Sequence, residues 1–417
     1  MLAALDRHGT RVALVAALAL PLLVIVSRSA AEAVFAGLAA GFLLRLARLR
    51  WSGAALPTLP AWFLAACGYW VWLVLGTLAN GAPAERLFAA LAWGRFPLAL
   101  LAVSSWLLVS EDARRWALRV TGASAAFVAL ETWAQFALGR GVTGSGRALP
   151  GYLSGPFTRP RVGAYLGQVM WPALLAATVT LRRGGAAAAA GAVLLIALGL
   201  GAVLLSGQRG AGVTAFVVLL LAGLLLPALR RPALGALAAA ALLAAAAPVV
   251  APDTFDRYAA QLPRLIATFP ETHYGQILAR ALAIHEASPW LGHGAEAFRH
   301  LCREPAYLVG WGGIGDGGGA AICVPHPHNH YLEALLDGGW PGLLLFSLFQ
   351  GLLAVAILRG LLAAPREPVR VGLALPLLLG LWPVATAGAY AGIEGAAPRT
   401  LMTGWALAAA RPPTSSA

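Results

Sequence analysis

The chain has 417 residues, of which 59% are hydrophobic and only 11% are charged; this excludes a soluble globular protein and indicates a polytopic membrane protein. All basic residues are Arg, and because the chain has no Lys it cannot contain a Walker A phosphate loop, which excludes a P-loop ATPase. The net charge of +13 comes from arginines that flank apolar stretches, so it favours topology signals and anionic lipid or phosphate partners over nucleic acid.

Apolar stretches of roughly the length that crosses a bilayer, about 20 residues, recur along the chain and predict an all-α fold with about 12 transmembrane helices. Nine of them would lie in residues 1–251 and three in residues 329–417, with a large polar loop at 252–328 between them. The predicted spans are 12–27, 30–45, 59–79, 86–109, 115–137, 160–181, 185–205, 210–229, 232–251, 329–358, 368–388 and 393–410.

The distribution of Arg predicts the orientation of these spans. With a cytoplasmic N-terminus, every inner loop carries a basic cluster, as the positive-inside rule requires. An even number of spans returns the C-terminus to the cytoplasm, and the first span is expected to be an uncleaved anchor. Segments 138–160 and 252–328 then lie on the outer side. The inner clusters are Arg45/Arg48/Arg50, Arg114/Arg115, Arg182/Arg183, Arg230/Arg231, Arg366/Arg370 and Arg411.

Several arginines fall on the outer side against this rule. Arg209 is the sharpest case, because it sits in a tight turn, 206–210, between two apolar spans, and a charge at the edge of the hydrocarbon is costly. Guanidinium groups that converge outside the membrane would suit a pyrophosphate, which they can bind bidentately. The alternative to a pyrophosphate site is that these side chains only extend to the polar interface of the membrane. The outer arginines are Arg140, Arg147, Arg159, Arg161, Arg209 and Arg280.

Seven of the eight histidines lie between residues 273 and 330, at the end of the polar loop. Pro325 and Pro327 keep the chain extended, and Asn329 is the expected N-cap of the helix that follows. His328 therefore lies at a helix N-terminus, whose positive dipole favours the neutral imidazole. A neutral His near pH 7 is the state that a general base needs.

Two other readings of these histidines stay open. The crowding of three of them into residues 326–330 could indicate a metal site. However, His285-Glu286 is not followed by a His at the HExxH spacing, and no Asp-x-Asp sequence occurs, so no metal is assigned. Packing or helix capping is the other reading, and it is preferred for His326 and His330.

The three cysteines are expected to have different roles. Cys302 and Cys323 both lie in the outer loop and would form a disulfide in an oxidising compartment; the alternative is two free buried thiols. Cys67 lies within a predicted span and is expected to be inert packing.

The sequence His328-Asn329, nine residues, Gly339, two residues, Gly342 resembles the His-Asn/Ser/Gln-x9-Gly-x-x-Gly/Thr/Tyr motif of bacterial O-antigen ligases, part of the O-antigen ligase/polymerase superfamily. As in that family, the motif falls where the large loop enters the next span. The predicted spans, with both ends cytoplasmic and one large late loop, are also similar, so the resemblance covers most of the chain.

Further matches follow the order of the family. Arg209 lies in a turn between two middle spans, and Arg280 precedes a Pro-x-x-Gly-x-Gly segment at 289–294. Arg161, which opens the sixth span, resembles a third arginine of the family, although Arg159 lies two residues away and could be the counterpart instead. The first five spans carry no motif that we can match.

The resemblance implies a GT-C-like glycosyltransferase of the bacterial inner membrane with a periplasmic active site. It would transfer a glycan from undecaprenyl pyrophosphate to a sugar hydroxyl of lipid A-core, with inversion at the anomeric carbon. Its partners would be that donor, that acceptor and membrane lipids, with no cofactor or metal, because the diphosphate is already a good leaving group. The implied residues are His328 as general base, Arg161, Arg209 and Arg280 on the diphosphate, and Asn329, Gly339 and Gly342 as supporting residues.

Other functions remain open at this stage. An O-antigen polymerase or an O-linked protein glycosyltransferase would share the donor and the architecture, but the motif spacing and a C-terminus soon after the last span favour the ligase. A transporter for a lipid-linked glycan would leave His328 without a role. It would also predict charges at mid-membrane depth in several spans, where only Arg95 obviously qualifies.

Overall fold

The computed structural model describes residues 2–147, 149, 151–259, 261–383, 390 and 392–411. Within these residues the chain is helical and contains no strand, so the all-α prediction is confirmed. The helices are α1 Leu2–Val26, α2 Arg28–Trp51, α3 Ala61–Ala79, α4 Ala84–Trp93, α5 Arg95–Ala102, α6 Glu111–Leu138, α7 Val162–Val169, α8 Trp171–Leu181, α9 Ala186–Leu205, α10 Arg209–Leu225, α11 Arg230–Val250, α12 Pro252–Ala259, α13 Gln261–Ala267, α14 His273–Ala287, α15 Ala297–Leu301, α16 His330–Ala363, α17 Pro368–Gly380 and α18 Ile393–Ala409.

Each predicted span coincides with a helix or a pair of helices, but the number of twelve is not confirmed. Seven helices in the described part are long and apolar enough to cross a membrane, and an eighth span results if α7 and α8, bent by 58°, are one broken span. Helices α10 and α17 are apolar but shorter, and the end of the predicted span 368–388 lies outside the described residues. The seven are His8–Val26, Arg28–Trp51, Ala61–Ala79, Ala84–Leu107, Ala186–Leu205, Pro227–Val250 and His330–Ala363.

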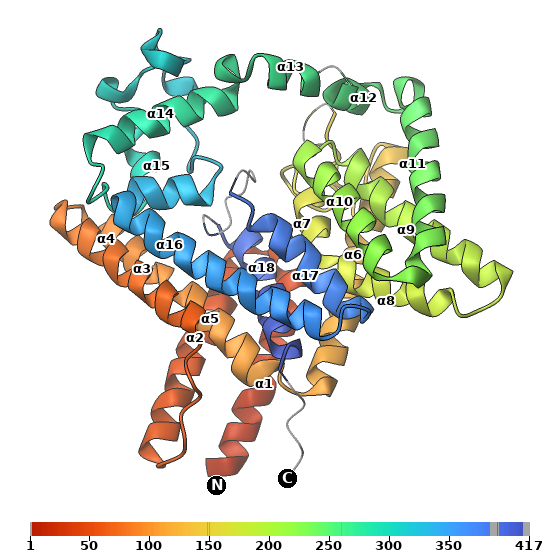
Figure 1. The fold of residues 1–417 in the computed structure, drawn as a ribbon, viewed down its shortest axis with the longest axis horizontal. Coiled ribbons are helices and arrows are strands. Elements are labelled where there is room, and N and C mark those ends of the chain that lie inside the picture. Colours follow the sequence, from red (N-terminus) through yellow and green to blue (C-terminus); the bar gives the residue numbers. More distant parts are fainter. Residues whose placement is uncertain are drawn as a thin grey trace.

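The helices form two groups that the polar segment connects. Helices α3 and α16 run side by side, while α6 to α11 gather on the other side of the molecule (Figure 1). Helix α18 contacts both groups, through α16 and α7. Helices α12 and α13 pass along the top of Figure 1 and join α11 to α14. The polar segment has a small core of its own, formed by Ile277, Ala281, Ile284, Ala297, Phe298, Cys302 and Ile322, with Leu336 of α16.

Helix α16 is broken at Gly339, which has φ 62° and ψ −160°. The carbonyl of Asp337 cannot be paired within the helix, because the residue four positions on is a proline and has no N–H. Instead the N–H of Gly294 donates to it at 2.9 Å, and the N–H of His293 donates to the carbonyl of Leu336 at 2.9 Å. The break therefore exposes carbonyls that the polar segment satisfies.

The exchange is mutual and requires glycine. The N–H of Trp340, released by the break, donates to the carbonyl of Pro289 at 2.9 Å. A Cβ on Gly339 would lie 2.4 Å from the carbonyl oxygen of Trp290, and one on Gly292 would lie 2.5 Å from a backbone oxygen of α16. A Cβ on Gly342 would lie 2.9 Å from the carbonyl oxygen of Ala334. Thus Gly292 and Gly339 form one close backbone contact between segment 289–294 and α16, whereas Gly342 packs closely within α16 itself.

We predict that Gly339→Ala destabilises the protein, whereas Gly351→Ala in the same helix does not. The conformation of Gly339 is nearly exclusive to glycine, which makes a side chain there cost roughly 1–3 kcal/mol before the clash with Trp290 is counted. Gly351 has nothing within 4 Å of an added Cβ. Thermal unfolding of the two purified variants in detergent tests this, and equal melting temperatures would contradict it.

Candidate active site

His328 lies immediately before the N-cap of α16. Asn329 is that N-cap, as predicted, since its Oδ1 accepts hydrogen bonds from the N–H groups of Tyr331 at 2.9 Å and Leu332 at 3.0 Å. His328 itself has φ 55°. In the described part of the chain only one other non-glycine residue, Glu296, has a positive φ. Strained backbone of this kind persists only where surrounding contacts enforce it, and it is frequent at functional sites.

His326 provides one of those contacts. Its Nδ1 accepts the backbone N–H of His328 at 3.2 Å, and the two imidazole rings lie 4.8 Å apart between centroids. Burial, and then the neighbouring His273, lower the pKa of His328; burial, with His328, Arg299 and Arg161 nearby, lowers the pKa of His326 to about 4. Both imidazoles are therefore neutral at pH 7, which is the state in which His328 can accept a proton.

The third histidine of the cluster points elsewhere. His330 is buried, and its ring lies against Tyr331 and Phe346, at 4.6 and 5.6 Å between centroids. Its ring contacts therefore differ from those of the facing pair, His326 and His328. Among the described residues, no group of three or more His, Cys, Asp or Glu side chains is arranged to hold a metal ion.

Arg161 is the N-cap residue of α7. Its charge is one of several that lower the pKa of His326, after burial and the charges of His328 and Arg299. Nη1 of Arg161 is 2.8 Å from Oε2 of Glu394, in the first turn of α18. The side chains of Arg161 and Glu394 are 33% and 19% exposed, so solvent reaches the pair.

Arg209 begins α10, and its neighbour Gln208 ties that helix to the start of α7. The Gln208 side chain accepts the N–H of Ala164 at 3.1 Å and donates to the carbonyl of Pro160 at 3.0 Å. Arg161 and Arg209 therefore stand at the N-termini of two adjacent helices, whose dipoles also favour an anion. No hydrogen bond or ion pair to another described residue engages the Arg209 guanidinium.

Two residues beside Arg209 were not predicted from the sequence. Arg257 of α12 donates from Nε to the carbonyl of Gly207 at 3.2 Å and from Nη2 to the Tyr152 hydroxyl, and its guanidinium lies 3.7 Å from the centroid of the Tyr152 ring. The buried hydroxyl of Tyr258 has no hydrogen-bond partner among the described residues. Burial raises the pKa of Tyr258 to about 12, although Arg257 and Arg209 oppose the shift. The signal that could have revealed them is the adjacent Arg-Tyr pair just after a predicted span.

Arg280 has surroundings different from those of Arg161 and Arg209. It is completely buried, and its terminal nitrogens donate to three backbone carbonyls of the polar segment: Cys302 at 2.8 Å, Asp316 at 2.8 Å and Gly319 at 3.2 Å. In this structure the guanidinium holds a glycine-rich loop together, and it is not brought together with the other two predicted arginines.

The disulfide expected from the sequence is present between Cys302 and Cys323, so the alternative of two free thiols is wrong. The same Arg280 nitrogen that binds the Cys302 carbonyl lies within 3.9 Å of both sulfur atoms. Cys67 is unpaired and half-buried within α3, as its expected packing role requires.

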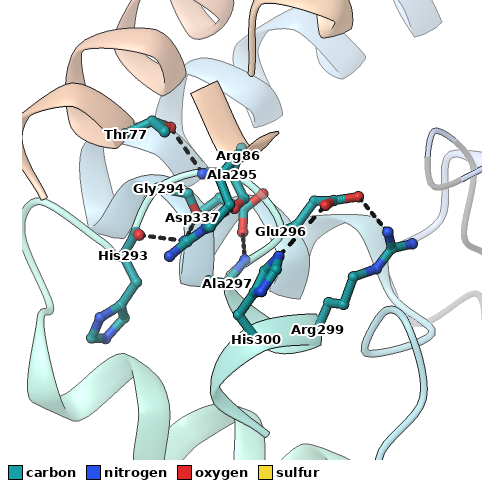
Figure 2. Close-up of polar contacts among 10 residues, drawn as sticks. All are labelled: Thr77, Arg86, His293, Gly294, Ala295, Glu296, Ala297, Arg299, His300 and Asp337. Carbon is teal, nitrogen blue, oxygen red and sulfur yellow. Dashed lines mark hydrogen bonds and ion pairs between the residues drawn. The ribbon is translucent and has the colours of Figure 1, made fainter. Parts of the chain in front are cut away.

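A second polar cluster fixes the polar segment to the helices, and its residues too were missed. Figure 2 shows Arg86 of α4 reaching the backbone of His293 and Gly294, to whose carbonyls it donates at 2.6 and 3.1 Å. Asp337 accepts the N–H of Ala297 at 2.9 Å. These contacts lie on the same backbone segment that fills the break in α16, so they set the position of the helix start that carries His328.

The positions of Glu296 and Arg299 complete this cluster. Glu296, the other residue with a positive φ, points to Arg299 (Figure 2), and its Oε1 lies 2.9 Å from Nη1 of Arg299. Arg299 in turn lies close enough to His326 to lower the pKa of that histidine. The two strained residues therefore belong to one connected region.

We predict that Arg280→Gln lowers the melting temperature, whereas Arg209→Gln leaves it nearly unchanged. Loss of the Arg280 guanidinium leaves buried carbonyls without donors, at a cost of about 1–3 kcal/mol each. Arg209 has no such partners. Thermal unfolding in detergent compares the two. An Arg280→Gln variant with wild-type stability and weakened binding of undecaprenyl pyrophosphate would instead return Arg280 to the diphosphate site suggested by the sequence.

Residues 194–347 match a family model described as O-antigen ligase. No curated protein matches the chain. The matched region includes Arg209, Arg280, His328, Gly339 and Gly342, whereas Arg161 and the first predicted spans precede it. This match agrees with the resemblance seen in the sequence: residues 194–347 are similar to the O-antigen ligase family.

Proposed function

We propose that the protein is an O-antigen ligase that transfers a glycan from undecaprenyl pyrophosphate to a sugar hydroxyl of lipid A-core, with inversion at the anomeric carbon. The reaction would take place on the periplasmic face of the bacterial inner membrane, with both termini in the cytoplasm. The observation that carries the proposal is a neutral His328, held at positive φ immediately before the N-cap of α16.

In this proposal His328 is the general base. Its imidazole takes the proton of the acceptor hydroxyl while that oxygen attacks the anomeric carbon of the donor. The bond between the anomeric carbon and the phosphate oxygen breaks, and undecaprenyl pyrophosphate leaves with the electron pair. Because the attack and the departure occur on opposite faces of the carbon, the configuration inverts.

Arg161 and Arg209 would hold the diphosphate and stabilise the charge that develops as it leaves. The proposal rests on their position at the first residues of adjacent helices, where backbone N–H groups add to the guanidinium charge. The unpartnered hydroxyl of Tyr258, beside Arg209, could donate to a phosphate oxygen. Arg280 would contribute from a distance, by holding the loop between the cysteines.

Asn329, Gly339 and Gly342 would support the site without touching the substrates. Asn329 fixes the start of α16 by capping it, and its Nδ2 also donates to the carbonyl of Pro383 at 2.6 Å. Gly339 permits the break at which the polar segment docks, and Gly342 permits the close approach of the Ala334 carbonyl within α16. No step in this scheme requires a metal or a nucleotide, because the donor already carries a diphosphate leaving group.

An O-antigen polymerase is the second candidate, because the matched family model does not separate ligation to lipid A-core from elongation of the lipid-linked glycan. Both reactions would use the same donor and the same base. They differ in the acceptor, which is a lipopolysaccharide core for one and a second lipid-linked glycan for the other. The acceptor is therefore what the experiment must identify.

The proposal is tested with purified protein in liposomes containing undecaprenyl-pyrophosphate-linked glycan and rough lipopolysaccharide, with EDTA and without ATP. Wild type should shift the lipopolysaccharide on a gel, and His328→Ala should abolish the shift while keeping the wild-type melting temperature. Lengthened lipid-linked glycan with unmodified lipopolysaccharide would identify the polymerase. Transfer that survives in His328→Ala would remove His328 from the role of base, and movement of the donor across the bilayer without transfer would identify a transporter.

The pH dependence of transfer gives a second test. A base must be deprotonated in the free enzyme, and burial lowers the pKa of His328 below the ordinary value of 6.5. We therefore predict that kcat/KM stays level as the pH falls from 7.5 to 6.5 and declines only below that value. A decline that begins above pH 7 would contradict a buried, neutral His328 as the base.

A further inference from the structure

We propose that Glu394 competes with the donor diphosphate for Arg161, and that it thereby weakens the binding of undecaprenyl pyrophosphate and promotes its release after transfer. This inference rests on the proposed function, because it assumes that Arg161 meets a diphosphate. It assigns to the start of α18 a role that the ligase-like sequence motif does not include.

The contact itself supports the proposal. Oε2 of Glu394 lies 2.8 Å from Nη1 of Arg161, within the range of a charge-assisted hydrogen bond. A carboxylate and a phosphate present similar anionic oxygens to a guanidinium. The Glu394 oxygen therefore occupies a position that a phosphate oxygen would need if Arg161 bound the donor through the same nitrogen.

The surroundings would stabilise either anion. Glu394 is in the first turn of α18, whose dipole favours a negative charge. Arg161 is the N-cap residue of α7, so the first N–H groups of that helix lie next to it. The site therefore combines a guanidinium with the starts of two helices. In the absence of donor, Glu394 supplies the negative charge that these groups would otherwise lack.

The exposure of the pair allows exchange. Both side chains are partly accessible, at 33% and 19%, so water can screen the pair, and partly exposed pairs of this kind are typically worth about 1 kcal/mol or less. A diphosphate carries more negative charge than one carboxylate, and in the proposed site it would also bind Arg209, at the start of the helix adjacent to α7. It can therefore displace Glu394, while the carboxylate remains available to take Arg161 back.

Competition of this kind would have a use in catalysis. Arginines that hold the substrate diphosphate also hold the product diphosphate, and slow product release limits the turnover of many enzymes. Binding the substrate and the transition state equally tightly does not raise kcat. A carboxylate that returns to Arg161 as the diphosphate departs would lower the affinity for product.

The test measures binding of undecaprenyl pyrophosphate to detergent-solubilised full-length protein by calorimetry, without acceptor and without transfer. Glu394→Gln keeps the size of the side chain and removes its charge, and it should tighten binding by roughly 2- to 5-fold, equivalent to about 0.4–1 kcal/mol. Glu304→Gln, which removes the same charge from an exposed position of the polar segment, should leave the affinity unchanged.

A double mutant shows whether the effect passes through Arg161. In an Arg161→Gln background, binding should be weaker and Glu394→Gln should no longer tighten it. If Glu394→Gln is unstable by thermal unfolding, Glu394→Asp shortens the side chain, keeps the charge and should tighten binding to a smaller extent. Unchanged or weaker binding in a stable Glu394 variant, or equal tightening with and without Arg161, would overturn the inference.

The readout separates this inference from the proposed function. If wild type transfers glycan and Glu394→Gln fails to tighten binding, the ligase stands and the role of Glu394 is refuted. If wild type binds undecaprenyl pyrophosphate only through residues other than Arg161, so that Arg161→Gln has no effect, both the diphosphate site and the competitor are refuted.

Discussion

The exchange of backbone hydrogen bonds between the break in α16 and segment 289–294 is the constraint on which the candidate site depends. Gly339 breaks the helix, and Pro341 has no N–H to donate to the carbonyl of Asp337. N–H groups of the polar segment donate to the carbonyls that are left unpaired at the break. The polar segment is thereby fixed to the first part of α16, the helix whose N-cap, Asn329, directly follows His328. Arg86 reinforces the same contact from α4, so three parts of the chain distant in sequence hold one helix start in place.

This constraint separates the two chemical tasks of the proposed reaction. The base would be positioned by the break in α16 and by the contact between His326 and His328. The groups that would bind the diphosphate, at the starts of α7 and α10, would be positioned independently of the base. The side chain of Gln208 joins these two helix starts. Helix α18 contacts both groups of helices and brings Glu394 to Arg161. The position of α18 would therefore affect how a donor binds between the two groups of helices.

Local features were predictable from the sequence, and distant pairings were not. The N-cap at Asn329 and the need for glycine at 339 follow from short-range backbone chemistry, and the disulfide follows from two cysteines in one polar loop. The burial of Arg280 could not be predicted, because the sequence pattern around an outer-loop arginine is the same whether its side chain faces a ligand or a cluster of backbone carbonyls. The pairing of Arg161 with Glu394 joins helices far apart in the chain, and no spacing rule reveals it. The number of twelve spans is not confirmed, because several helices in the described part of the chain are short or bent.

The most direct measurement is a cryo-electron microscopy structure of the His328→Ala protein in a lipid nanodisc with undecaprenyl-pyrophosphate-linked glycan bound. The account predicts diphosphate density in contact with Arg161 and Arg209, Glu394 withdrawn from Arg161, and the anomeric carbon facing the position of the missing imidazole. Diphosphate density bound elsewhere, or an anomeric carbon turned away from residue 328, would contradict the central claim that these helix starts form one active site.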